Sequence, residues 1–76
     1  MVRIERNHDG SYLLTFVGVR GPDGYSLRAR CVSIRSIKAT LKRWRRQHGR
    51  ANGLTFTDSD TAFECGKALV GVESLA

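Results

Sequence analysis

Residues 25–49 read YSLRARCVSIRSIKATLKRWRRQHG, and the spacing of their apolar side chains changes at Ser33. Before Ser33 every second side chain is apolar, which is the pattern of a strand with one buried face. After Ser33 a narrow stripe repeats at helical spacing: Ile34, Ile37, Leu41, Trp44 and His48. Ser33 is a good helix N-cap, and Gly49 is placed to end the helix. The stretch therefore predicts a strand followed by an amphipathic helix.

The residues upstream predict two more strands. Val2–Arg6 alternates apolar and polar side chains, and residues 7–10 have the composition of a turn. Residues 11–19 form a strong strand candidate with apolar groups on both faces, which a central strand would explain. We expect Tyr12, Leu14 and Phe16 on one face and Leu13, Val17 and Val19 on the other. The sequence Gly-Pro-Asp-Gly at 21–24 predicts the turn into the return strand.

The residues downstream leave one choice open. Asn52-Gly53 predicts a turn, and residues 54–57 predict a short strand. Asp58–Asp60 could turn a hairpin arm into residues 61–65, or residues 58–72 could contain a second helix. The capping-box spacing of Thr61 and Glu64 favours the helix.

These elements predict an α+β fold in a single domain, residues 1–76. We expect a small two-layer domain, with an antiparallel sheet of three to four strands packed against one long basic helix and a short C-terminal helix. A chain of 76 residues has no volume for an enclosed cofactor or a deep substrate cavity. Neither a cofactor nor a small-molecule substrate is expected. The absence of a long apolar run and of a signal-type start predicts no membrane partner and a cytoplasmic location.

Cysteine, histidine and acidic residues give no sign of catalysis or metal binding. Cys31 and Cys65 suit small buried side chains in a reducing compartment, with a disulfide as the alternative. Two cysteines and two histidines without paired ligand spacing do not predict a metal site. His8 and His48 have no nucleophile or orienting carboxylate nearby in sequence, so we expect no enzyme. Asp58 and Asp60 suit capping of the next element.

The distribution of charge carries the functional prediction. The net charge is +6, and no acidic residue lies between Gly24 and Thr57. A row of cations can neutralise several phosphates at once and release condensed counterions. The predicted binding residues for nucleic acid or an acidic partner are the nine cations of that interval: Arg28, Arg30, Arg35, Lys38, Lys42, Arg43, Arg45, Arg46 and Arg50. Trp44 lies among them, and we expect it either in the core or, as the second possibility, stacked on a base.

The order of hairpin, basic return strand and Ser-capped helix resembles the three-stranded arm-type DNA-binding domains of phage tyrosine recombinases. The matching residues cover about half of the chain: Gly10, Ser11, Tyr12, residues 25–30, Ser33, Ile37, Leu41 and Trp44. In that family the sheet enters the major groove, which implies that Arg28 and Arg30 contact DNA and that the helix adds phosphate contacts. The sequence departs from the pattern after Gly49 and in its unusually basic helix. More loosely, its size and charge asymmetry resemble small phage and mobile-element regulators such as anti-CRISPR proteins.

Three functions follow as hypotheses. The first is a sequence-tolerant nucleic-acid-binding module, for DNA or RNA. The second is an inhibitor or adaptor that docks on an acidic surface of a nucleic-acid-handling protein complex, using an uncovered apolar sheet face. The third is self-association through an open sheet edge, with the charges serving only solubility. The oligomeric state is left open between a monomer and a small homo-oligomer.

Overall fold

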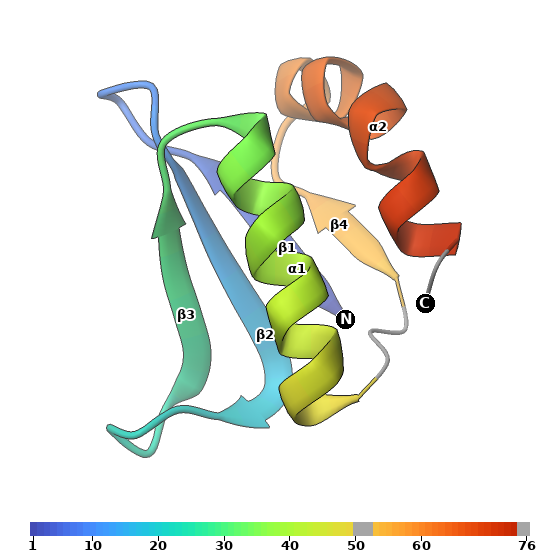
Figure 1. The fold of residues 1–76 in the computed structure, drawn as a ribbon. Coiled ribbons are helices and arrows are strands. Elements are labelled where there is room, and N and C mark those ends of the chain that lie inside the picture. Colours follow the sequence, from blue (N-terminus) through green and yellow to red (C-terminus); the bar gives the residue numbers. More distant parts are fainter. Residues whose placement is uncertain (50–52, 75–76) are drawn as a thin grey trace.

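The computed structural model describes residues 1–49 and 53–74, which contain four strands and two helices. A hairpin-rich N-terminal half is followed by a helix, a short strand and a second helix (Figure 1). In chain order the elements are β1 (Val2–Arg6), β2 (Tyr12–Arg20), β3 (Ser26–Cys31), α1 (Ile34–His48), β4 (Leu54–Phe56) and α2 (Ser59–Ser74).

The sheet is mixed, which corrects the expected antiparallel sheet. Its strand order is β3-β2-β1-β4, and β2 is a central strand as predicted. The β1–β2 and β2–β3 pairs are antiparallel, whereas β4 pairs with β1 in parallel, with Ile4 opposite Phe56. The reason is the connection: α1 carries the chain back along β3, so β4 leaves in the direction of β1. A parallel neighbour requires such a crossover in place of a tight turn.

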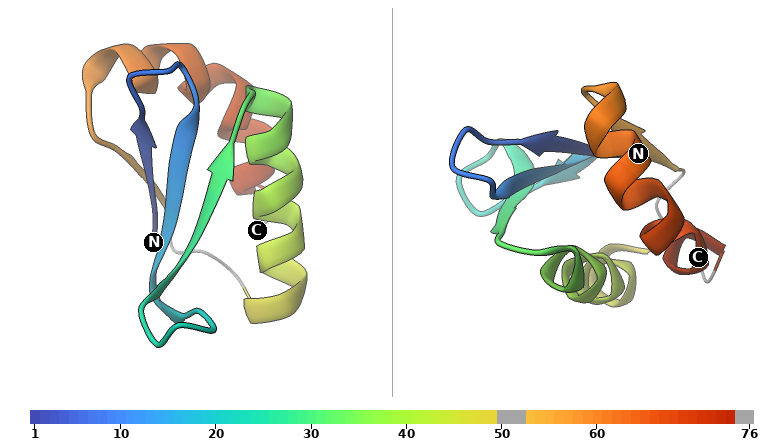
Figure 2. Two further views of the ribbon diagram at one scale, coloured as in Figure 1. Left: turned by 90° about the vertical axis from the view of Figure 1, so that its left-hand side faces the viewer. Right: turned by 90° about the horizontal axis from the view of Figure 1, so that it is seen from above.

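Both helices pack on the same face of the sheet, which gives the predicted two layers (Figure 2). The inward side chains of the strands meet those of the helices in one core. Its buried members are Val2, Ile4, Tyr12, Leu14, Phe16, Cys31, Ile37, Leu41, Trp44, Cys65 and Leu69. The opposite face of the sheet is covered by neither helix.

The second helix exists, so the hairpin-arm alternative is wrong. With 16 residues α2 is as extensive as α1, which has 15, and the expected short C-terminal helix is also wrong. Asp58 caps α2, because its carboxylate accepts hydrogen bonds from the Thr61 amide at 2.7 Å and the Thr61 hydroxyl at 2.9 Å. Thr61 therefore lies inside the first turn and is not the cap that its spacing to Glu64 predicted.

The termini of α1 agree with the sequence. The Ser33 hydroxyl accepts a hydrogen bond from the Ser36 amide at 3.2 Å, and the amide of Gly49 donates to the Arg45 carbonyl at 3.0 Å. Gly49 has a φ of 89°, a backbone conformation that glycine adopts without strain.

One face assignment on β2 is wrong. Val19 was expected beside Leu13 and Val17, but it packs against the core. The register of β2 against β3 shifts between Phe16 and Arg20, and Gly18 in this interval has a φ of 92°. An irregularity of this kind turns the following side chains to the other face of a strand. The uncovered face therefore carries less apolar surface than predicted.

Both cysteines are free and buried, which excludes the disulfide alternative. The Cys31 thiol lies 3.4 Å from the Thr40 hydroxyl, so it helps to join β3 to α1. Within the described part of the chain, no three histidine, cysteine or acidic side chains are grouped so as to hold a metal ion. Among the same residues, no helix has the length and apolar character needed to cross a membrane.

A substitution at Ile4 should measure how much the buried centre of the sheet contributes to the free energy of unfolding. Ile4 is fully buried and lies between Leu14 of β2 and Phe56 of β4. We expect Ile4→Val to lower the free energy of unfolding by about 0.5–1.5 kcal/mol, measured by urea denaturation, because it removes one buried methylene. Val17→Thr is the control, since Val17 is exposed, and it should change the value by less than about 0.5 kcal/mol. Equal effects of the two substitutions would contradict this assignment of the core.

Candidate nucleic-acid interface

The net charge of the protein resides on one helix. α1 contains six cations, Arg35, Lys38, Lys42, Arg43, Arg45 and Arg46, and no acidic residue. The chain has 13 lysines and arginines and seven acids, so 13 − 6 = 7 cations remain outside α1 against seven acids. These balance, and the whole +6 belongs to a helix of 15 residues. Such segregation produces a field directed from one side of the molecule.

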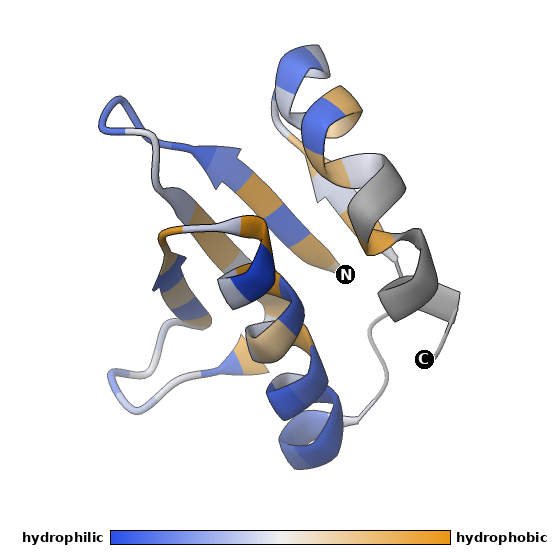
Figure 3. Cartoon of the chain, turned by 45° about the horizontal axis from the view of Figure 1, so that its top comes forward, coloured by the Kyte–Doolittle hydropathy of each residue, from blue (hydrophilic) through white to orange (hydrophobic). Residues whose placement is uncertain are grey.

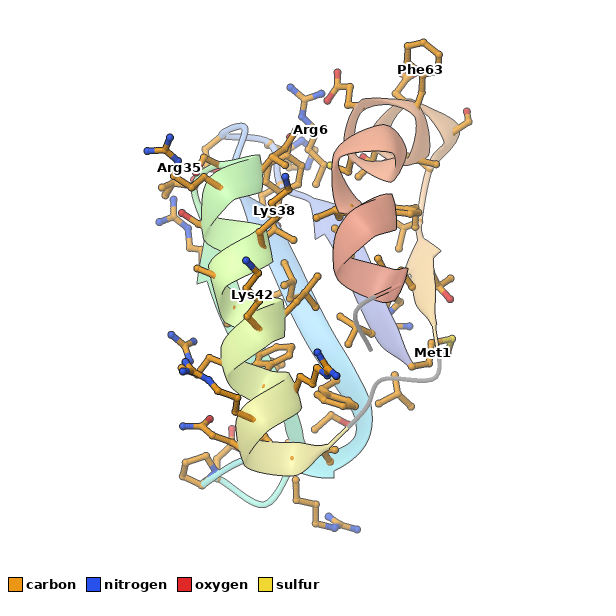
Figure 4. All side chains as sticks on the ribbon, turned by 45° about the vertical axis from the view of Figure 1, so that its right-hand side comes forward. Met1, Arg6, Arg35, Lys38, Lys42 and Phe63 are labelled. Atoms are coloured by element: carbon orange, nitrogen blue, oxygen red, sulfur yellow. The ribbon has the colours of Figure 1, made fainter. Side chains whose placement is uncertain are left out.

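The packing of α1 determines where these cations lie. A buried stripe of Ile37, Thr40, Leu41 and Trp44 faces the sheet. At 3.6 residues per turn, Lys38 and Arg45 then lie on one flank of the exposed surface and Arg43 on the other. Arg35, Lys42 and Arg46 lie between the flanks. Figure 3 shows the hydrophilic colouring of most of the helix. Figure 4 shows Arg35 and Lys42 extending from its outward side and Lys38 extending from its edge nearest α2. We call this set of six cations the α1 surface.

The α1 surface has no internal counter-charge. Across residues 1–49 and 53–74, no described ion pair or side-chain hydrogen bond involves any of the six cations. They are also close to one another, because five pairs are three or four positions apart: 35 with 38, 38 with 42, 42 with 45, 42 with 46, and 43 with 46. Like charges at this spacing destabilise a helix.

Helix electrostatics explain only part of the pattern. Arg45 and Arg46 lie in the last turn, where cations interact favourably with the helix dipole. Arg35 lies in the first turn, which contains no acidic residue, and a cation is unfavourable there. The first half of α1 therefore carries charge that does not stabilise the helix itself.

Arg28 and Arg30 belong to a different surface. They project from the uncovered face of the sheet, as predicted, and the structure does not bring them together with the α1 surface. Arg28 pairs with Asp23 at 3.0 Å and Arg30 with Asp9 at 2.8 Å. Counting the Arg3–Glu5 pair at 3.4 Å, three of the four arginines on this side have acidic partners, and Arg20, opposite Ser26, donates instead to the Gly24 carbonyl at 2.6 Å. The uncovered sheet face therefore carries little net charge.

These acidic partners were not predicted from the sequence. Asp9 and Asp23 lie outside the strands, in the two hairpin turns, so each was assigned only to its turn. Hydrogen bonds from the hydroxyl and the amide of Ser11, then the Arg30 guanidinium, hold the pKa of Asp9 far below its ordinary value. The Tyr25 amide and then Arg28 lower the pKa of Asp23. One sequence pattern could have predicted these ion pairs: an aspartate in a hairpin turn, next to a strand that has an arginine at every second position.

Two further predicted residues have different outcomes. Trp44 is 3% exposed, and its ring centre lies 5.7 Å from that of Phe16. It therefore has the core position, and its ring is not displayed on the α1 surface for stacking on a base. Arg50 lies outside the described residues.

Comparisons with known proteins return no match: none with a protein-family model, none with a curated protein sequence and none with a solved structure.

The depressed pKa values predict a loss of stability in acid. The pKa values of Asp9, Asp23 and Asp58 are all lower in the folded chain than the ordinary value, Asp58 chiefly through the Thr61 amide. As the pH falls, these three carboxylates bind protons in the unfolded chain before they do so in the folded chain. The stabilisation that the charged carboxylates give to the fold is therefore present above about pH 4 and is lost below it. The urea midpoint should change little between about pH 7 and about pH 5 and fall at lower pH. Asp9→Asn should make this fall shallower, and an unchanged acid profile in that variant would contradict the assignment.

Reversing one charge on α1 should stabilise the protein. Lys42 has like-charged neighbours at Lys38, Arg45 and Arg46, so Lys42→Glu converts three repulsions into attractions. We expect Lys42→Glu to raise the free energy of unfolding by about 0.5–1.5 kcal/mol at low salt. The value for Lys42→Gln should lie between those of the wild type and Lys42→Glu, and the differences among the three proteins should shrink as salt is added. Thermal unfolding at two salt concentrations measures this. If Lys42→Glu is less stable than the wild type at low salt, the repulsion inferred for α1 is absent.

Proposed function

We propose that this protein is a small, sequence-tolerant nucleic-acid-binding module that contacts phosphates through the α1 surface. The observation that carries the proposal is the location of the whole net charge on one exposed helix without internal partners. Phosphates supply the missing counter-charge, and the release of condensed counterions from the nucleic acid favours binding. Four of the six side chains are arginines, whose planar forks can bind phosphate through two hydrogen bonds. The proposed role is binding without catalysis, in the cytoplasm, where free thiols persist.

The proposal assigns Arg28 and Arg30 a lesser role than α1. The resemblance to recombinase arm-type domains implies docking through the sheet. The charge balance of the uncovered sheet face favours docking through α1 instead, because Arg28 and Arg30 already have carboxylate partners. Those ion pairs are exposed and therefore weak, so the two arginines remain able to make secondary contacts.

A second candidate is an inhibitor or adaptor of phage or mobile-element origin, in which the α1 surface binds an acidic groove on a nucleic-acid-handling protein. Exposed Tyr25, Val32 and Phe63 favour it, because large exposed apolar side chains are common in protein interfaces. The uncovered sheet face supports this candidate less than the sequence predicted. Val19 packs into the core, so this face exposes less apolar surface for a protein partner. The two candidates differ in what occupies the α1 surface.

Two matched double variants test the proposal. Lys42→Gln with Arg46→Gln removes two charges from the α1 surface, and Arg3→Gln with Arg28→Gln removes two from the sheet face. The helix variant should bind a labelled DNA duplex more weakly, and the slope of log affinity against log salt should become shallower by about 1.8. The sheet variant should keep most of the affinity and of the slope. Fluorescence anisotropy at several salt concentrations gives both quantities.

Both variants have the same net charge, so any difference between them reports location. Equal losses would show that only total charge matters, and a larger loss in the sheet variant would place the interface on the sheet. Either result would contradict the role proposed for α1. Circular dichroism should show that both variants remain folded, since all four positions are exposed.

A further inference from the structure

We infer that α1 binds in the major groove of B-form duplex DNA, in preference to RNA duplexes or single strands. The inference rests on the proposed function and specifies its ligand. Its basis is the distribution of the α1 surface around and along the helix. In Figure 2, α1 lies on the sheet beside α2, and no other described element covers its outward side.

The cations surround the exposed half of α1. Going around the helix from Arg45 to Arg43 over the outward side, they cover about 160° of its circumference. A flat phosphate surface would contact only the middle of this arc. A groove would also contact the flanks, with one wall at Arg43 and the other at Lys38 and Arg45, which lie on the flank nearer α2. The arrangement therefore fits a concave ligand with phosphates on two sides.

The dimensions also fit. An α-helix with its side chains is about 10–12 Å across, and the major groove of B-form DNA is about 12 Å wide. From Arg35 to Arg46 the helix rises about 17 Å. Because duplex DNA carries one charge per about 1.7 Å of its axis, a stretch of this length presents about ten phosphates on two strands. A single strand presents half that number on one side only.

One position within the arc carries a short side chain. Ala39 is exposed and points between the directions of Arg46 and Arg43, and its side chain is a single methyl group. The cations around it are long and flexible, so they can extend to the groove walls while the helix backbone lies near the base edges. No acidic residue in α1 would repel the phosphates.

The alternatives lack a matching feature. Proteins that bind single strands stack the bases on exposed aromatic rings, and the tryptophan of α1 is buried. The exposed aromatic rings of Tyr25 and Phe63 belong to the β2–β3 turn and to α2. The major groove of A-form RNA is deep and narrow, so a helix of ordinary diameter does not fit into it.

The test compares probes that differ in groove geometry and share a sequence. Fluorescence anisotropy at low salt would measure wild-type binding to a DNA duplex, an RNA duplex and a single DNA strand of equal length. Two further DNA duplexes would contain 5-hydroxymethylcytosine, one with its hydroxymethyl groups free and one with them glucosylated. Glucose fills the major groove and leaves every phosphate in place, so the duplex without glucose is the matched control. Netropsin would be added to the plain DNA duplex to occupy its minor groove.

We expect the DNA duplex to bind at least about tenfold more tightly than the RNA duplex or the single strand. Glucosylation should weaken binding by a similar factor relative to its control, whereas netropsin, which occupies the minor groove, should have little effect. Equal binding of all probes, with a steep salt dependence, would overturn the groove inference and leave the phosphate-binding function intact. A lack of binding to every probe would overturn the proposed function itself and indicate an acidic protein as the partner.

Discussion

The structure depends on one narrow apolar contact between α1 and the sheet. Ile37, Leu41 and Trp44 are buried on the helix, and Trp44 packs against Phe16 of β2. With Thr40 and the half-buried Ile34, this stripe occupies only part of the circumference, and the outward positions of α1 do not contribute to the core. They are free to carry charge, and six of them do. Burial of apolar surface along the stripe opposes the repulsion among those charges.

The same contact organises the rest of the chain. Docking of α1 along the sheet returns the chain to the edge of β1, and this places β4 in parallel with β1. α2 then covers the β1–β4 half of the sheet, and its Cys65 and Leu69 complete the core. Since both helices lie on one face, the acids and arginines of the other face are left to pair with one another. The fold thus separates a cationic side from a nearly neutral side.

Local patterns were enough to predict most elements. Ser33 and Gly49 define α1, and alternation defines β1 and β3, because these signals depend on neighbours in the sequence. The direction of β4 and the inward turn of Val19 depend on contacts between distant residues, and no local pattern contains them. For the cap of α2 the sequence offered both Asp58 and Thr61. The Asp58 prediction is confirmed and the Thr61 prediction is wrong, and only the backbone shows which residue accepts the bond.

The candidate site was predicted in part. The absence of acids between Gly24 and Thr57 identified the cations of α1, but it grouped them with Arg28 and Arg30. Charge counted along a sequence does not reveal that Asp9 lies beside Arg30, 21 positions away. The structure separates the two groups, because Arg28 and Arg30 project from the face of the sheet opposite to the one on which α1 packs.

The most direct test of this account is an NMR titration of the ¹⁵N-labelled protein with a short DNA duplex at low salt. If the α1 surface is the interface, the backbone amide shifts should change progressively across residues 35–46, with much smaller changes in β3 and in the β1–β2 turn. Changes centred on Arg28 and Arg30 would place the interface on the sheet, and a spectrum that does not change would show that the charge of α1 has another purpose. Either result would contradict the central claim.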